Sequence, residues 1–115
     1  MLRGEIRLVD LDPTRGSEAS QRRPAVIVSN DGANAMAARL GRGVVTVVPV
    51  TSSVERVHPF QVLLAAEETG MPRDSKAQAE QVRSVDVERL GAVVGRLSGP
   101  LIHALDDALG LHLAL

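Results

Sequence analysis

Two arginines beside a proline are the residues of this sequence with the clearest chemical potential. Arg22 and Arg23 precede Pro24 at the start of the apolar stretch AVIVS. A proline disfavours helical geometry in the residue before it, so we expect Arg23 to be extended at the beginning of a strand. A guanidinium held in this way suits a phosphate, because its planar fork matches phosphate oxygens. Solvated loop charges are the alternative explanation of these two residues, and residue type alone favours it, while their spacing does not decide between the two.

The rest of the composition excludes several kinds of catalytic and metal site. The chain has no cysteine, which excludes thiol nucleophiles and cysteine-ligated zinc, and its three histidines (His58, His103 and His112) are scattered. We therefore expect neither a metal nor another cofactor, and we expect these histidines to be structural. The net charge of −1 argues against a protein that grips many phosphates at once.

The charge is unevenly distributed along the chain. Residues 1–60 carry a net +2 and residues 61–115 a net −3, which favours an anion site in the first half. Of the 13 basic residues only Lys76 is a lysine. Arginine suits phosphates and base edges better than lysine does, although codon bias explains the same excess.

Alternating apolar residues and turn signals predict a single domain over residues 1–115, built mostly from strands. Pro49 cannot donate a ladder hydrogen bond, so an edge or a bulge is expected there. A short irregular helix is predicted at residues 31–40, capped by Asn30 or Asp31, and a helical turn at residues 86–90. The strands are expected at residues 5–11, 25–29, 44–51, 60–64, 76–83 and 92–97.

Ser98 is expected to cap a final helix with one apolar face. That face would be formed by Leu101, Ile102, Leu105, Ala108 and Leu109. Several short strands followed by a terminal helix predict an α+β fold, a small antiparallel β-barrel, and not alternating βαβ units. So small a core favours dimerisation, and the lack of a long apolar run or a leader predicts a cytoplasmic protein without a membrane span.

Four sequence blocks, taken in order, resemble the MazF, PemK and Kid family of messenger-RNA interferases. They are RGEIRLVDLDP with the following GSE and RRPAVIVSND, then VVPVTS, then RDSKAQAEQVRSVD, and finally LDDALGLHLAL. Any one of them would be a weak signal, but four blocks in register over essentially the whole chain are a strong one. The resemblance implies the SH3-like barrel of the CcdB and Kid type, dimerised so that two substrate grooves run across the interface.

The resemblance also implies an activity. Family members cut single-stranded RNA at short sequences by attack of the 2′-hydroxyl, which leaves a 2′,3′-cyclic phosphate and a 5′-hydroxyl. An antitoxin of the MazE type silences them by inserting a flexible acidic C-terminal segment, which Arg22, Arg23 and Arg83 could receive here. The catalytic residues implied are Arg23 and Thr51. The implied RNA-binding residues are Ser17, Glu18, Arg22, Ser52, Glu80, Gln81 and Arg83.

Elementary chemistry constrains these roles. A guanidinium resists deprotonation, so Arg23 is better suited to stabilising the charge of the five-coordinate phosphate and to donating a proton than to acting as a base. Thr51 could donate to a nonbridging oxygen, although a threonine that ends a strand is also ordinary in a sheet. Ser17 and Glu18 could belong to a substrate-covering loop that turns at Gly16, or to a solvated turn. For Glu80, Gln81 and Arg83, salt bridges are an alternative to base and phosphate contacts.

Two departures from the family pattern affect RNA recognition: the scarcity of aromatic residues, and Gln78 between Ala77 and Ala79, which makes its strand more polar than in many relatives. Many members have an aromatic residue where this chain has Arg7, and Phe60 is its only aromatic. Single-stranded RNA is commonly held on aromatic side chains, so hydrogen bonds, guanidinium stacking and shape must contribute more here.

A second hypothesis is a toxin of the same fold that poisons DNA gyrase; such proteins rely on a tryptophan near the C-terminus, which this chain lacks.

Overall fold

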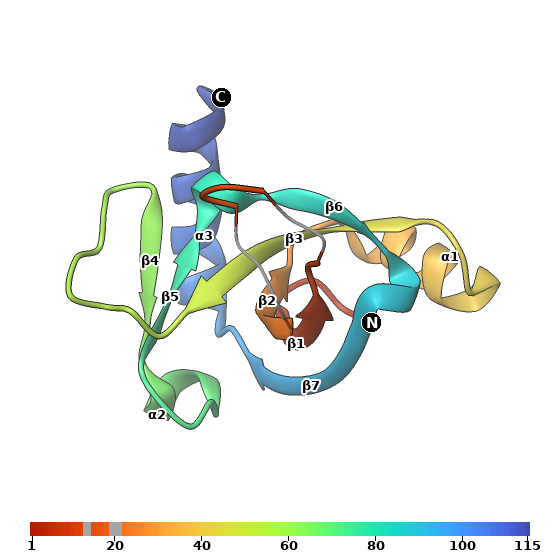
Figure 1. The fold of residues 1–115 in the computed structure, drawn as a ribbon, viewed down its shortest axis with the longest axis horizontal. Helices are drawn as coiled ribbons and strands as arrows, with labels where there is room; N and C mark the ends of the chain where they lie inside the picture. The colour runs from red at the N-terminus through yellow and green to blue at the C-terminus, as the bar shows by residue number, and fades with distance from the viewer. Residues whose placement is uncertain (13–14, 19–21) are drawn as a thin grey trace.

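A computed structural model describes residues 1–12, 15–18 and 22–115 of the chain. One strongly curved antiparallel sheet is flanked by helices (Figure 1). Its strands are β1 (Glu5–Asp10), β2 (Arg22–Ile27), β3 (Val44–Thr51), β4 (Gln61–Leu64), β5 (Ser75–Gln78), β6 (Arg83–Asp86) and β7 (Leu90–Arg96). The helices are α1 (Asp31–Leu40), α2 (Ala66–Thr69) and α3 (Gly99–Leu113), with 3₁₀ turns η1 (Ala79–Gln81) and η2 (Val87–Arg89).

The strands follow the order β4-β5-β3-β2-β1-β7, and β6 pairs with β3 beside β5. The α+β class with an antiparallel sheet and a C-terminal helix is confirmed. The sheet is not closed into a barrel, because no pairing joins β4 to β7 among the described residues. None of the helices in the described ranges is long and apolar enough to cross a membrane.

The central strands are buried on both faces. On β2, Ala25 and Ile27 pack into a cluster beneath α1, while Val26 between them packs into a cluster beneath α3. Strand β3 alternates in the same way. Two small cores therefore hold β2 and β3 from opposite sides, which makes the ends of these strands rigid supports for side chains.

The predicted segment at residues 76–83 is two strands and not one. Val47 pairs with Arg83 on β6, Val50 pairs with Ala77 on β5, and η1 interrupts the edge between them. The Thr46 carbonyl accepts from the Val28 nitrogen, so the backbone groups of Thr46 point towards β2. Backbone groups alternate in direction along a strand, so those of Pro49, three residues later, point towards the other edge, where the interruption lies. The irregularity expected at Pro49 is thus present, and it takes the form of a break in the neighbouring strand.

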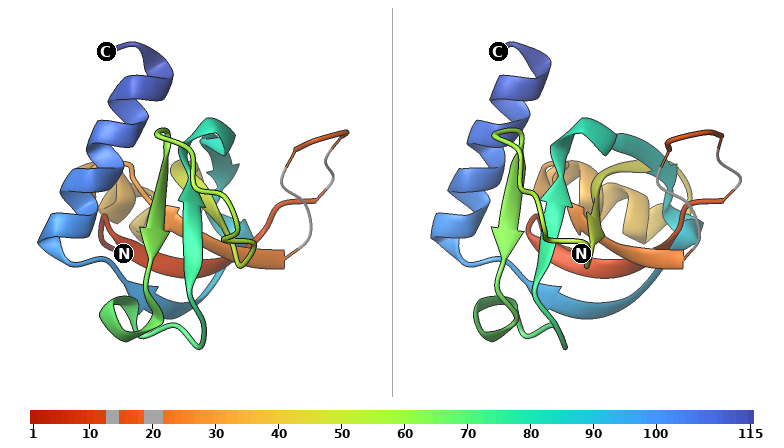
Figure 2. Two further views of the ribbon diagram at one scale, coloured as in Figure 1. Left: turned by 90° about the vertical axis from the view of Figure 1, so that its left-hand side faces the viewer. Right: turned by 60° about the vertical axis from the view of Figure 1, so that its left-hand side comes forward.

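Both predicted helices are present, and α1 is regular where an irregular helix was expected. The side chain of Asn30 accepts from the Ala33 nitrogen at 2.8 Å and caps α1, which ends at Gly41 with a φ of 66°. Ser98 caps α3 as predicted, and Leu105 and Ala108 of its apolar face are buried. Figure 2 shows α3 standing beside β4, with the C-terminus at its free end. Short α2 was not predicted.

Candidate functional site

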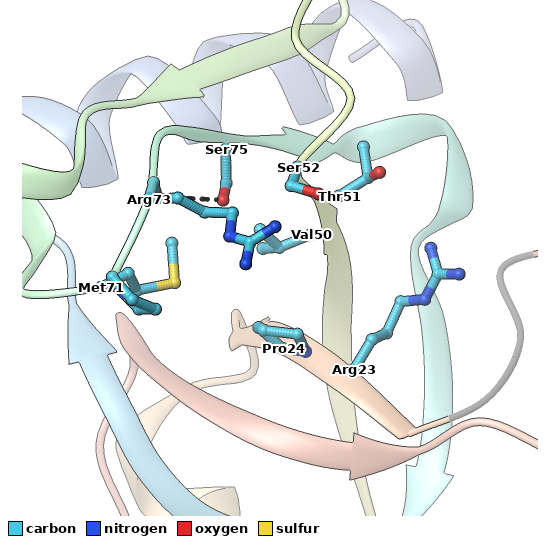
Figure 3. Close-up of a pocket in the computed structure, with 9 residues that line it drawn as sticks. Arg23, Pro24, Val50, Thr51, Ser52, Met71, Arg73 and Ser75 are labelled. Atoms are coloured by element: carbon cyan, nitrogen blue, oxygen red, sulfur yellow. Dashed lines mark hydrogen bonds between the residues drawn. The ribbon is translucent and has the colours of Figure 1, made fainter.

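Arg23 and Thr51 line the same pocket, which has a volume of about 300 Å³. We call it the arginine pocket, and Figure 3 shows its side chains. Its lining residues are Arg23, Pro24, Val50, Thr51, Ser52, Met71, Pro72, Arg73 and Ser75. None of these described residues is acidic, and the lining includes two guanidinium groups and the hydroxyl groups of Thr51 and Ser52, which suit an anion.

The two strands that carry Arg23 and Thr51 are neighbours. Ala25 of β2 pairs with Pro49 of β3, so the first residues of β2 and the last residues of β3 lie at the same end of the sheet. Pro24 and Val50 form part of the floor between them, and Val50 is only 2% exposed. The extended position of Arg23 on a proline-braced strand is confirmed.

Thr51 is held where its hydroxyl can donate outward. Its Oγ1 accepts from the Ser53 nitrogen at 3.3 Å, which occupies one lone pair and leaves the hydroxyl proton for another partner. Thr51 of β3 pairs with Lys76 of β5. The ammonium group of Lys76 donates to the Arg56 carbonyl at 2.6 Å. This bond ties the segment that follows Thr51 to the sheet, so the rim of the pocket at Ser52 is anchored at both ends.

A second arginine enters the arginine pocket from its opposite side. Arg73 precedes β5, and in Figure 3 its side chain reaches over the floor towards Val50. We did not predict Arg73 or Ser75 as site residues. Arg73 opens one of the sequence blocks on which the family resemblance rests, but nothing in the sequence indicates that this block folds back beside Arg23.

The predicted RNA-binding residues divide between pockets. Ser52 belongs to the arginine pocket, whereas Glu18, Glu80, Gln81 and Arg83 line another pocket of about 330 Å³ together with Val82. We call this second site the loop pocket. Ser17 joins it through its carbonyl, which accepts from Gln81 Nε2 at 3.0 Å.

Most polar groups of the loop pocket already have partners in the protein. Arg83 Nη1 donates to the Leu11 carbonyl at 3.1 Å, and Glu80 Oε2 accepts from Gln61 Nε2 at 2.6 Å. The other carboxylate oxygen of Glu80 is buried without a hydrogen-bond partner. Among the described residues, hydrogen bonds therefore hold Glu80 and Arg83, and no salt bridge joins either of them to a partner.

A closed turn carries Ser17 and Glu18. The Arg15 nitrogen donates to Glu18 Oε1 at 2.7 Å, and the Glu18 nitrogen donates back to the Arg15 carbonyl at 3.1 Å. Gly16 has a φ of 57°, so it supplies the left-handed conformation expected of it. The turn is exposed and is attached to the sheet by the bond from Gln81.

Arg22 lies apart from Arg23. Successive side chains of a strand point to opposite faces, and Arg22 lines a separate pocket that includes Asp10, Asp86 and Glu88. Arg89 also lines this pocket, but the three carboxylates outnumber the two guanidinium groups, so it is a less favourable setting for RNA phosphates than the arginine pocket. The structure thus does not bring Arg22 together with the other predicted site residues.

The histidines also lie outside both pockets. His58 stacks on Phe60 with ring centroids 5.2 Å apart, and His112 of α3 approaches the same ring at 6.5 Å. Phe60 is therefore engaged between two histidines and is absent from the arginine pocket. In the described part of the chain, no group of three or more histidine, aspartate or glutamate side chains could hold a metal ion.

Comparison with known proteins gives consistent results. The model of the PemK-like, MazF-like toxins of type II toxin-antitoxin systems matches residues 2–113. Endoribonuclease MazF9 of Mycobacterium tuberculosis is 64% identical over 115 residues, covering 100% of this chain and 98% of that protein. Endoribonuclease EndoA of Bacillus subtilis is 31% identical over 114 residues, covering 98% and 94%.

Solved structures agree on the fold. The crystal structure of MazF from Deinococcus radiodurans has a TM-score of 0.83 at 24% identity and covers 100% of this chain and 97% of its own. An endoribonuclease in complex with its cognate antitoxin, from a mycobacterial species, has a TM-score of 0.76 at 23% identity, with coverage of 100% and 96%.

Proposed function

The chain belongs to the PemK-like, MazF-like family of toxins of type II toxin-antitoxin systems, and we propose that it is an endoribonuclease that cuts single-stranded RNA. The observation that carries this proposal is the placement of Arg23 and Thr51 on the rim of one pocket whose described lining residues include no acid. Relatives named endoribonuclease over the whole chain length support the same activity.

The proposed reaction is an in-line transfer within the RNA. The 2′-hydroxyl loses its proton to solvent water as its oxygen attacks the adjacent phosphorus, the bond to the 5′-oxygen breaks, and that oxygen takes up a proton. The products are a 2′,3′-cyclic phosphate and a 5′-hydroxyl. Negative charge accumulates on the nonbridging oxygens of the five-coordinate phosphate. Donors placed in advance around that charge lower the barrier, and removal of one such donor typically costs about 10²–10³-fold in rate.

Arg23 would supply most of this stabilisation. A guanidinium is a cation with several donors, so Arg23 can neutralise the nonbridging oxygens and donate a hydrogen bond to the leaving 5′-oxygen. Thr51 would donate its hydroxyl proton to a nonbridging oxygen, since its Oγ1 lone pair is used by the Ser53 nitrogen. These two donors account for the charge without a metal ion, and we propose a metal-independent reaction.

RNA on either side of the cut would contact the rest of the site. Ser52 lies beside Thr51 in the arginine pocket, and the loop pocket offers Ser17, Glu18, Glu80, Gln81 and Arg83. The carboxylate of Glu80, which lines the loop pocket, is of a type that accepts from a base amino or imino group. We leave Arg22 out of the proposed site because its acidic neighbours disfavour phosphate.

We further propose that the protein acts as a cytoplasmic homodimer silenced by a MazE-like antitoxin. Structures of a mycobacterial endoribonuclease with its cognate antitoxin and of MazE-MazF from Deinococcus radiodurans have this fold and support the partnership. A flexible acidic C-terminal segment of the antitoxin would compete with RNA for Arg23 and Arg83. Arg22 faces another pocket and would not take part.

The activity is tested with purified protein, single-stranded RNA and excess EDTA. We expect cleavage with 2′,3′-cyclic phosphate ends by mass spectrometry, and we expect a 2′-deoxy nucleotide at the cut to block it. Cleavage of that deoxy position would rule out 2′-hydroxyl attack. Intact RNA together with inhibition of DNA gyrase would replace the proposal with the gyrase-poisoning alternative.

A further inference from the structure

The floor of the arginine pocket is apolar in a way that phosphate chemistry does not require. Pro24, Val50 and Met71 form it, and Val50 and Met71 are 2% and 5% exposed. A phosphate needs charged and polar donors, which stand on the rim. Apolar surface at the bottom of an open pocket of about 300 Å³ suits a ligand with a flat apolar face.

Arg73 is presented to this floor from a fixed segment. In the segment before Arg73, the Met71 nitrogen donates to Thr69 Oγ1 at 3.4 Å. In the segment after it, the Ser75 hydroxyl donates to the Arg73 carbonyl at 3.3 Å. Asp74 Oδ1 also accepts from the Ala66 nitrogen of α2 at 2.9 Å. The backbone on both sides of Arg73 is thus held, so that its guanidinium can serve as one wall of the pocket, as Figure 3 shows.

The position of the only aromatic residue makes such a wall significant. Phe60 is stacked with His58 and does not line the arginine pocket. Unpaired RNA bases are held by stacking on aromatic rings or on arginine guanidinium planes. The guanidinium of Arg73 is a planar group that lies over the apolar floor of the pocket, which Arg23 and Thr51 also line.

We propose that the arginine pocket holds the nucleobase next to the scissile phosphate, stacked between the Arg73 guanidinium and the floor of Pro24, Val50 and Met71. The inference rests on the proposed ribonuclease function and deepens it. The phosphate lies on the rim at Arg23 and Thr51, while the base enters the pocket. Stacking depends on a π-face that every base has, so this position tolerates exchange of the base better than its removal.

The test combines enzyme variants with abasic RNA in single-turnover cleavage. An abasic nucleotide on one side of the cut should lower kcat/KM about tenfold or more, the value of one stacked base. Arg73→Ala should cause a similar loss on intact RNA and little further loss on the abasic RNA. Arg73→Lys keeps the positive charge but lacks the planar guanidinium, so it should behave like Arg73→Ala. Arg42 is exposed, and Arg42→Ala should match the parent protein.

Other outcomes overturn the inference. If the loss from Arg73→Ala and the loss from the abasic nucleotide multiplied, or if Arg73→Lys restored full activity, Arg73 would act as a cation on phosphate. Wild-type cleavage by Arg73→Ala would also reject it while leaving the ribonuclease intact. No cleavage of RNA by the parent protein would reject the proposed function and the inference together.

A binding measurement provides a readout independent of cleavage. A non-cleavable RNA with 2′-deoxy sugar at the cut carries 2-aminopurine in place of the neighbouring base. Transfer of this base from its RNA neighbours into the pocket should change its fluorescence with the parent protein and with Arg42→Ala, and Arg73→Ala should remove most of that change. An equal change with all three proteins would contradict the proposed stack.

Discussion

The arginine pocket and the loop pocket both contain arginine, but their polar groups are used differently. In the loop pocket, Arg83 donates to the Leu11 carbonyl and Gln81 to the Ser17 carbonyl, so both hold the chain in place. In the arginine pocket, the Thr51 oxygen accepts from Ser53 and keeps its proton available for a ligand. The comparison suggests that one pocket performs the chemistry and that the other shapes the substrate groove.

Replacement of Arg23 by alanine should have the largest effect. Loss of the charge clamp is expected to lower the single-turnover rate about 10²–10³-fold or more at saturating RNA, because the clamp acts on the transition state. Arg42→Ala is the matched control and should cleave at the parent rate. A rate for Arg23→Ala within a few-fold of the parent protein would remove the arginine pocket from the mechanism.

Thr51→Val should follow, since valine keeps the shape and the β propensity but has no hydroxyl. We expect a loss of about tenfold to hundredfold in kcat, the value of one hydrogen bond to a charged oxygen. Thr51→Ser should recover most of the rate in the same assay. If Thr51→Val retained full activity, Thr51 would be an ordinary strand residue.

Gln81→Glu should act on binding and not on chemistry. A carboxylate of the same size cannot donate to the Ser17 carbonyl, so the turn at residues 15–18 would lose its link to η1. KM should rise about two- to tenfold with kcat unchanged, and hydrogen exchange in the turn should accelerate. A fall in kcat equal to that of Thr51→Val would erase the distinction between the two pockets.

The smallest effect is expected at Glu5, outside both pockets. This carboxylate contacts Arg7 at 3.1 Å and Arg96 at 3.3 Å. Burial raises the pKa of Glu5, but a hydrogen bond with the Leu2 backbone and the hydrogen bond and charge of Arg7 outweigh burial, so the pKa lies below the usual range of a glutamate.

A lowered carboxylate pKa contributes stability above the unfolded pKa, and the contribution disappears as the pH falls through the folded pKa. Glu5→Gln should therefore lower Tm by a few degrees at pH 7 and by less at pH 3, with RNA cleavage at pH 7 unchanged. An equal drop in Tm at both pH values would show that the charge of Glu5 is not stabilising.

Much of the fold could be predicted because its signals are local. The VVTVVPVT run gave β3 with its observed bounds, and Ser98 with the apolar face behind it gave α3. The helix α2 was missed because four residues are too short for a periodic pattern. The split between β5 and β6 depends on which partner edge the Pro49 nitrogen faces, and that is a property of the assembled sheet.

The site was predictable only in part, because some of its residues meet only in the assembled sheet. Proline after Arg23 indicated a braced arginine, and the family resemblance supplied Thr51. Strand alternation already implied that Arg22 and Arg23 could not share a face, so the separation of Arg22 was available from the sequence. Arg73 could not be placed, because it reaches the pocket only through the pairing of β5 with β3.

The most direct test of the central claim is a crystal structure of the protein with single-stranded RNA that carries a 2′-deoxy sugar at the cut. The scissile phosphate should lie in the arginine pocket, within hydrogen-bond distance of Arg23 and the Thr51 hydroxyl. A scissile phosphate bound in the loop pocket against Arg83, with the arginine pocket unoccupied, would contradict the account.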